Sequence, residues 1–191
     1  MSGSGEGLVR LTLPVPRGVL SELTFGDEVL LTGPVFTARD ATHERLVDAL
    51  ERDGELPFGL DGATLFYAGP TPPAAGRPVG SVGPTTAKRM DAATPALLRA
   101  GIVATVGKGR RSPEVMEACV QTGSVYFAAV GGAAALMATY VESAETVAWP
   151  ELGTEALVRL ELRDFPVFVA VDTRGGDLYA SAPREFRETG R

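Results

Sequence analysis

The hydrophobic pattern of this chain changes period just after Thr37, and that change narrows the folds available to it. Residues 28–37 are rich in β-forming side chains and predict a strand. Residues 39–53 instead predict an amphipathic helix, because charged residues alternate with a set that recurs at helical spacing on one face: His43, Leu46, Val47 and Leu50. A strand that leads directly into such a helix favours an α/β fold.

The rest of the chain continues this alternation. Strands are predicted over residues 8–13, 64–68, 102–106, 125–130, 157–162 and 167–172, and helices over 86–100, 112–122 and 133–140. Pro95 must kink the second predicted helix or start a new one. Ser112-Pro113-Glu114 supplies an N-cap, a proline at the first helical position and an acid in the first turn. Residues 167–172 are expected to turn through 173–176 into a terminal hairpin with 177–180. The predicted class is mixed α/β.

One domain is expected, because no linker or charge block divides the 191 residues. We assign it to residues 8–183, between a flexible N-terminus at 1–7 and a C-terminal tail at 184–191. No basic segment followed by an apolar stretch opens the chain, and no run reaches the roughly 18 apolar residues of a membrane helix. The expected protein is soluble, cytoplasmic and without a membrane span.

The chain has a single cysteine, Cys119, and a single histidine, His43. It therefore cannot form an intrachain disulfide, and it cannot build a multi-cysteine or multi-histidine metal site alone. Cys119 falls within the helix predicted at 112–122, which favours a buried thiol over a nucleophile. His43 lies on the apolar face of its helix, where a packed histidine with one satisfied nitrogen is favoured over a functional one.

A basic segment stands out in an otherwise acidic chain. Residues 77–111 contain only one acid, Asp91, against seven basic residues: Arg77, Lys88, Arg89, Arg99, Lys108, Arg110 and Arg111. The segment carries a charge of +6 while the whole chain carries −6. An anionic partner is expected. Gly107-Lys108-Gly109 lacks the spacing of a P-loop, and the segment has no aromatic residue for stacking on nucleic acid, so neither partner is favoured.

Three of the cations occupy turns between predicted strands and helices. Arg39 follows the strand at 28–37, Lys108 follows the strand at 102–106, and Arg89 lies one turn into a helix after a Gly-Pro-Thr-Thr start. The carboxyl ends of strands and the N-termini of helices are where α/β proteins place anionic ligands. Convergence of the three on one acidic ligand is the hypothesis, and a solvated surface charge is the alternative for each.

Seven segments spread over nearly the whole chain form a recognisable set: 33–43 (GPVFTARDATH), 67–70 (YAGP), 83–91 (GPTTAKRMD), 108–112 (KGRRS), 131–132 (GG), 149–156 (WPELGTEA) and 164–166 (DFP). Together, and in this order, they resemble the C-terminal region of class I iron–sulfur fumarases. In two-subunit relatives that region is the β subunit of fumarate hydratase or L(+)-tartrate dehydratase.

The resemblance implies a swivelling β/β/α domain and a hydro-lyase that reversibly hydrates a dicarboxylate double bond at a [4Fe–4S] cluster. Such a cluster needs about three cysteine thiolates. Because this chain has one cysteine, the resemblance implies that a separate α subunit holds the cluster, that this chain supplies no metal ligand, and that it is active only with that partner. A hetero-oligomer (α2β2) is expected, or a β dimer when the chain is isolated.

The family's site residues match four positions here. By resemblance, Arg39, Arg89 and Lys108 bind the substrate carboxylates, and Thr85 matches the threonine proposed as catalytic base. Guanidinium forks suit carboxylates, and a lysine supplies a point charge that stabilises an enolate-like, aci-carboxylate intermediate. An ordinary hydroxyl is a weak base, so Thr85 needs surrounding cations to favour its alkoxide, or it relays a proton. Its alternative role is helix capping.

Reversible hydration of fumarate to L-malate is the function that the resemblance favours. A tartrate or mesaconate-type dehydratase β subunit is an alternative, as is a non-catalytic module that binds a dicarboxylate or another anion. Lys88 and Arg110 stand where the family usually has Gly and Asn, and both add positive charge near the expected site. Three interpretations of this extra charge stay open: a substrate more anionic than fumarate, a different diacid, or surface drift without a functional role.

Overall fold

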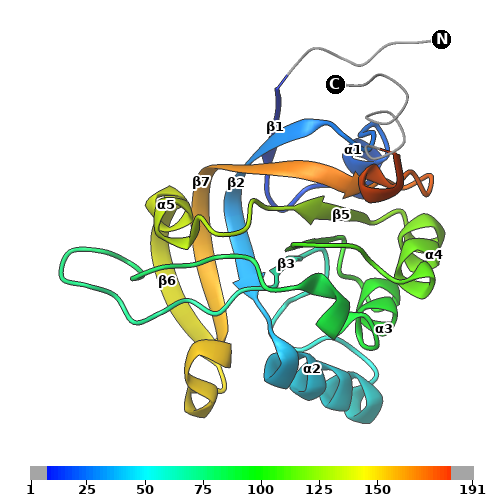
Figure 1. Ribbon diagram of the computed structural model, residues 1–191. Coiled ribbons are helices and arrows are strands. Elements are labelled where there is room, and N and C mark those ends of the chain that lie inside the picture. The colour runs from blue at the N-terminus through cyan, green and yellow to red at the C-terminus, as the bar shows by residue number, and fades with distance from the viewer. Residues whose placement is uncertain (1–7, 182–191) are drawn as a thin grey trace.

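The computed structural model describes residues 8–181, and within them seven strands form one sheet (Figure 1). The strands are β1 (Val9–Thr12), β2 (Glu28–Thr37), β3 (Thr64–Phe66), β4 (Ala104–Gly107), β5 (Val125–Ala128), β6 (Val141–Ala148) and β7 (Leu157–Val171). The α-helices are α1 (Arg17–Leu20), α2 (Asp40–Asp53), α3 (Thr94–Arg99), α4 (Pro113–Thr122) and α5 (Ala134–Met137). Three 3-10 helices complete the list: η1 (Ala87–Met90), η2 (Ala138–Tyr140) and η3 (Pro150–Glu155).

The long strand β7 closes the sheet on itself. Strands β1 to β5 are parallel to their neighbours in chain order. β7 runs antiparallel to three strands: to β6 through its first half, to β5 through its last residues, and to β2 along most of its length. Pairing with both β2 and β5 closes β2, β3, β4, β5 and β7 into a ring, so backbone groups of β2 and β5 that would lie on open edges are hydrogen-bonded instead.

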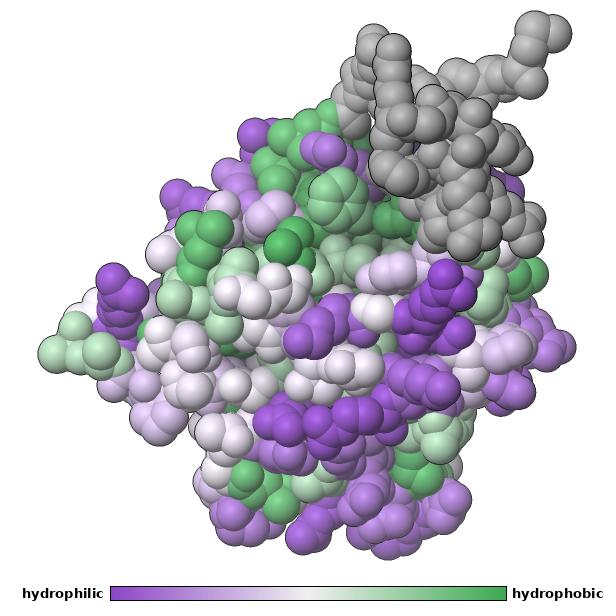
Figure 2. All heavy atoms as spheres, in the orientation of Figure 1, coloured by the Kyte–Doolittle hydropathy of each residue, from purple (hydrophilic) through white to green (hydrophobic). Residues whose placement is uncertain are grey.

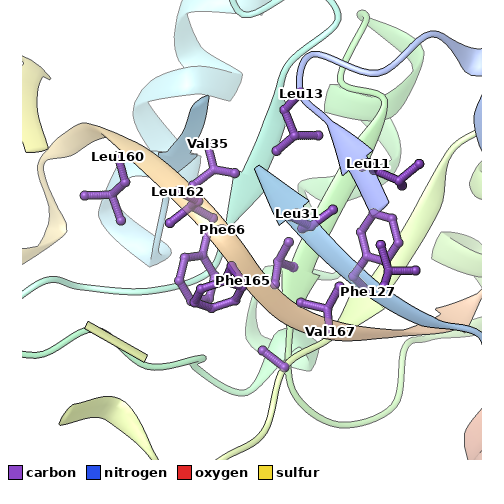
Figure 3. Close-up of a cluster of buried hydrophobic side chains, with 14 of the residues drawn as sticks. Leu11, Leu13, Leu31, Val35, Phe66, Phe127, Leu160, Leu162, Phe165 and Val167 are labelled. Carbon is purple, nitrogen blue, oxygen red and sulfur yellow. The ribbon is translucent and has the colours of Figure 1, made fainter. Parts of the chain in front are cut away.

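Two apolar cores lie on the two faces of this sheet. Inside the closed sheet, Phe66, Phe127 and Phe165 pack with aliphatic side chains from β1, β2 and β7 (Figure 3). On the outer face, Leu65 and Tyr67, the neighbours of Phe66, point toward α2, α3 and α4. The period-2 alternation of a strand thus feeds both cores. Two β layers with one helical layer form a mixed α/β fold, as predicted, and are compatible with the expected β/β/α domain.

Most predicted elements are present, with instructive differences. Ser112 caps α4 by accepting the Val115 N–H through its hydroxyl oxygen, as predicted. Pro95 starts a second helix, α3, after the single turn of η1. The prediction of a terminal hairpin is wrong. Asp177 makes a single bridge to Val171, and the Asp177 carbonyl then accepts the N–H groups of Ala180 and Ser181 in a helical turn.

Two strands differ from expectation for identifiable reasons. β6 was not predicted, because it is an edge strand with mostly exposed side chains and shows no apolar alternation. β7 is continuous across Pro166, where two strands were predicted. Pro166 lies between the stretches of β7 that pair with β6 and β5, so a strand flanks it on the β2 side only and its missing N–H is tolerated.

The predicted flexible start at 1–7 and tail at 184–191 lie outside the described residues. Within the described part of the chain, none of the helices is long and apolar enough to cross a membrane.

We predict that the inner core is sensitive to truncation at Phe165. This ring is fully buried and meets Phe66 and Tyr140 edge-on, at centroid distances of 5.4 and 6.1 Å. Phe165→Ala should lower the free energy of unfolding by about 3–5 kcal/mol, because it removes buried area and leaves a cavity. Urea titration measures the loss. Leu136→Ala is the control, since its side chain is 59% exposed, and equal losses for the two variants would contradict the assignment.

Candidate active site

The three predicted cations lie at one edge of the sheet. β2, β3 and β4 are adjacent and parallel, so their carboxyl ends meet there. Arg39 follows the end of β2 by two residues, Lys108 follows β4 directly, and Arg89 lies in η1, which the chain reaches by the long loop after β3. The topology therefore brings the three positions to the edge of the sheet where α/β proteins place ligands, and their convergence on one acidic ligand stays a prediction.

Backbone hydrogen bonds hold Thr85 between the ends of β3 and β4. Its N–H donates to the Tyr67 carbonyl at 2.6 Å, and its carbonyl accepts the Lys108 N–H at 3.2 Å. The Lys108 carbonyl in turn accepts the N–H of Ala87 at 2.9 Å. The segment thus extends the sheet by a short bridge, and Thr85 and Lys108 are hydrogen-bonded neighbours. Thr86, not Thr85, precedes η1, and no side-chain cap forms there, so the helix-capping alternative for Thr85 is wrong.

Gly107 allows this close approach. A Cβ atom at position 107 would lie 2.9 Å from Cδ2 of Tyr67 and 3.1 Å from Cβ of Ala87. Any side chain there would push η1 away from the end of β4, and with it both Thr85 and Arg89. The glycine before Lys108 is therefore explained by the close approach of η1 and not by phosphate binding.

Arg89 forms a two-pronged ion pair with Asp40. Its Nε and Nη2 donate to the two carboxylate oxygens of Asp40 at 3.0 and 2.7 Å. The Arg89 side chain is 50% exposed. Because Asp40 is the first residue of α2 and directly follows Arg39, this pair holds η1 against the start of α2. η1 is a single 3-10 turn, so the anion attraction expected of a helix N-terminus does not apply to it.

Arg39 lies against a glycine and an acid. Its Nη2 is 3.2 Å from Oε1 of Glu155, and both side chains are about one quarter exposed, at 23% and 24%. A Cβ at Gly69 would come within 3.1 Å of the Arg39 side chain and 2.7 Å of the Thr154 carbonyl. Gly69 therefore leaves the space through which the guanidinium reaches the site. Nε of Arg39 is buried and has no hydrogen-bond partner within the described residues.

Arg111 is buried beneath the site, although the sequence counts it among the anion-attracting cations. Its Nε donates to Asp91 at 2.7 Å, and its guanidinium lies over the rings of Tyr67 and Tyr126, 5.1 and 4.8 Å from their centroids. Its remaining nitrogens donate to the hydroxyls of Tyr67, Thr94 and Thr105. Burial opposes its charge, but the oxygens of Tyr67 and Asp91 outweigh burial and raise its pKa.

His43 supports Arg39 from within the helix layer. Nδ1 of His43 lies 2.8 Å from the Arg39 carbonyl, which fixes the neutral tautomer with its proton on Nδ1. Nε2 is buried with no partner among the described residues, and the ring meets Tyr67 edge-on at 5.1 Å. Burial lowers the pKa of His43 to about 4. The prediction of a packed histidine with one satisfied nitrogen is confirmed.

The chain's residues do not fit an iron–sulfur cluster. Cys119 is buried in α4, as predicted, and burial raises its pKa to about 11, far from the thiolate that a cluster requires. Within residues 8–181, no group of three or more His, Cys, Asp or Glu side chains is arranged to hold a metal ion.

Figure 2 shows hydrophilic side chains gathered across the middle of one face of the molecule, near the start of α2 in the orientation of Figure 1. Lys88 and Arg110 are both exposed, and Arg110 donates to the Tyr179 carbonyl at 2.8 Å.

Sequence reasoning missed the acids that pair with the basic residues: Asp40, Asp91 and Glu155. Asp40 adjoins Arg39 in the chain, Asp91 is the only acid in the basic segment, and Glu155 lies in the motif at 149–156, which had no assigned role.

Comparison with known proteins gives consistent matches. The family model described as "Fumarase C-terminus" matches residues 4–182. The anaerobic class I fumarate hydratase of Escherichia coli is 38% identical over 183 residues, which cover 93% of this chain and 33% of that protein. Fumarate hydratase 2 of Leishmania major is 37% identical over 166 residues, or 86% of this chain and 29% of that protein. The L(+)-tartrate dehydratase subunit beta of E. coli is 36% identical over 183 residues, covering 93% of this chain and 90% of that subunit. The chain thus spans about a third of the fumarate hydratases and most of the tartrate dehydratase subunit.

We predict that Arg111→Met lowers the free energy of unfolding by about 3–5 kcal/mol, because it leaves the Asp91 carboxylate buried beside apolar side chains without its cation. Arg110→Met is the matched control. Its guanidinium is exposed, so its loss should stay within about 0.5 kcal/mol. Urea titration of both variants measures the difference, and a small loss for Arg111→Met would rule out a structural role for the buried pair.

The buried His43 predicts a loss of stability in acid. As pH falls below 6.5, the unfolded chain binds a proton on His43, while the folded chain resists until pH is near 4. Acid therefore favours unfolding, by about 2 kcal/mol between pH 7 and pH 5 from this group. His43→Gln removes the group, so its free energy of unfolding should fall by correspondingly less over that interval. Parallel urea titrations at the two pH values test this, and identical pH dependence in both proteins would contradict it.

Proposed function

The chain belongs to the Fumarase C-terminus family, and from that premise we propose that it is the β subunit of a two-subunit hydro-lyase acting on a small dicarboxylate. The favoured reaction is the reversible hydration of fumarate to L-malate. The partner is an α subunit that holds a [4Fe–4S] cluster and activates the substrate. The subunit arrangement is supported by the tartrate dehydratase subunit beta, which this chain matches along most of that subunit's length. The cytoplasmic location expected from the sequence stays a prediction.

One observation carries the proposal: four residues lie at one edge of three adjacent parallel strands, namely Arg39, Thr85, Arg89 and Lys108. Arg89 pairs with Asp40, the chain neighbour of Arg39, and Thr85 accepts the Lys108 N–H through its carbonyl. Two arginines and a lysine suit a ligand with two carboxylates, because each guanidinium offers a planar pair of donors.

In this proposal Arg39 and Arg89 bind the carboxylates of the diacid and fix its orientation. Lys108 offsets the negative charge that builds on a carboxylate when the adjacent carbon loses its proton. Thr85 exchanges that proton through its hydroxyl, and the neighbouring cationic side chain of Lys108 lowers the energy of the alkoxide form. The backbone hydrogen bond from the Lys108 N–H to the Thr85 carbonyl keeps the segments that carry the ammonium group and the hydroxyl next to each other.

A tartrate-type dehydratase of the same architecture is the second candidate. The relative that this chain spans almost fully acts on L(+)-tartrate, and the exposed Lys88 and Arg110 add positive charge to the surroundings of the site. A more oxygenated diacid offers more acceptors to these donors. The non-catalytic anion-binding module is the third candidate, and turnover by the complex excludes it.

The complex should lose activity when Arg89 is truncated. We predict that this chain, purified anaerobically with its α partner, turns over at least one of fumarate, L-tartrate and mesaconate. Arg89→Ala should lower kcat/KM by about a hundredfold or more, because the substrate carboxylate loses its charged partner. Arg99→Ala, which removes an exposed guanidinium on α3, is the control with near-parental kinetics. The isolated chain should be inactive.

The ratio of kcat/KM values across the three diacids identifies the substrate. An assembled, cluster-loaded complex that turns over no C4 or C5 diacid would refute the hydro-lyase proposal. Equal effects of Arg89→Ala and Arg99→Ala would refute the assignment of Arg89.

A further inference from the structure

Both arginines assigned to the substrate already have a carboxylate partner within this chain. Asp40 pairs with Arg89 through two hydrogen bonds, and Glu155 pairs with Arg39 at 3.2 Å. Neither acid has a role in the proposed reaction. Such partners either compete with the substrate for the guanidinium groups or hold those groups in a productive orientation.

The geometry of the Arg89 pair favours orientation. A guanidinium group has two edges that can donate a pair of parallel hydrogen bonds to a carboxylate. Asp40 occupies the edge formed by Nε and Nη2. No hydrogen bond to Nη1 of Arg89 is found within residues 8–181, so the edge formed by Nη1 and the second Nη2 proton stays open. One carboxylate from the protein and one from a ligand can therefore bind Arg89 together.

Stability does not account for the Arg89 pair. The arginine is 50% and the aspartate 33% exposed, and ion pairs in such positions contribute little to folding. A free arginine side chain samples many rotamers, and a ligand that binds it has to order it first. A fixed carboxylate at the start of α2 does that ordering in advance.

Glu155 is held more firmly than a surface acid. Its Oε2 accepts the Ala41 N–H at 2.9 Å, near the N-terminus of α2, where the helix dipole favours a negative group. The Thr42 hydroxyl donates to the Glu155 carbonyl. With one oxygen fixed by the helix, the other faces Nη2 of Arg39. This gives a role to the Trp149–Ala156 motif, which contains η3 and carries Glu155 to Arg39.

We propose that Asp40 and Glu155 are positioning residues: each binds one part of an arginine and presents the rest of its guanidinium to a carboxylate of the substrate. The inference rests on the proposed function for the identity of the ligand. In this proposal the two acids belong to the binding site and do not compete with the substrate for the arginines. Removal of either acid therefore weakens substrate binding, although removal of a competitor would strengthen it.

Kinetics of the α–β complex distinguish these two roles. Asp40→Asn and Glu155→Gln keep the side-chain shape and remove the charge. Each should raise KM for the diacid about tenfold, as expected for loss of one charge-assisted contact, with a smaller change in kcat and a nearly unchanged melting temperature. Asp40→Glu should recover part of the loss. An unchanged or lower KM overturns the assignment for that arginine, and so does a KM increase matched by a large fall in melting temperature.

The chain offers matched controls for both substitutions. Asp48→Asn makes the same change on an exposed position of α2. Glu151→Gln makes the same change in η3, where the carboxylate is 60% exposed and lies 3.9 Å from Arg45. Both controls should keep the parental KM. A rise in KM in a control equal to that in its partner variant would show a general charge effect and overturn the proposal.

A second readout separates this proposal from the function on which it rests. In the full chain labelled with ¹⁵N-arginine, the Nε–H signal of Arg89, assigned by its loss in Arg89→Lys, reports the bond to Asp40. Asp40→Asn should shift and broaden that signal, while Asp48→Asn leaves it in place. An unperturbed signal in Asp40→Asn overturns the positioning role. If the complex turns over no diacid, the proposed function fails, yet this signal still decides whether Asp40 orders Arg89.

Discussion

The buried ion pair between Arg111 and Asp91 is the interaction on which the arrangement of the site depends. Arg111 follows the end of β4 in the loop that begins with Lys108, and Asp91 directly follows η1, which carries Arg89. A buried charge is costly unless every donor is satisfied. Here the guanidinium donates to a carboxylate and to hydroxyls, and two tyrosine rings enclose it. The pair therefore holds two cation-bearing segments in one fixed relation.

Pairing with acids also explains how several arginines fit near one edge of the sheet. Arg39, Arg89 and Arg111 each have a carboxylate partner in this chain, namely Glu155, Asp40 and Asp91. Like charges at short range repel, and partly buried ones are screened little by salt. The partners offset that repulsion before any ligand arrives. Within the described residues Lys108 has no such partner, and its ammonium stays available for charge that develops during a reaction.

Much of the fold follows from local sequence patterns, and the remainder depends on contacts between distant segments. The cap at Ser112 and the restart at Pro95 are local, so both were predictable. The edge strand β6 has no apolar alternation, and its pairing with β7 alone makes it a strand. Pro166 breaks a strand pattern in sequence, but β7 continues through it because a strand flanks only one side there. Closure of the sheet is likewise a long-range event that no window of sequence contains.

Prediction of the site from the sequence was limited in the same way, by contacts between distant segments. The parallel order of β2, β3 and β4 was implied by alternating strands and helices, and it places Arg39, Arg89 and Lys108 at one edge. Charge counting could not separate Arg111, which is buried and neutralised, from exposed cations such as Lys88. A sum of charges over a segment treats every charge as solvent-facing, whereas burial depends on tertiary packing. The attraction for anions therefore comes from fewer residues than the +6 segment suggests, and it is more directed, because two of the arginines are held by acids from outside that segment.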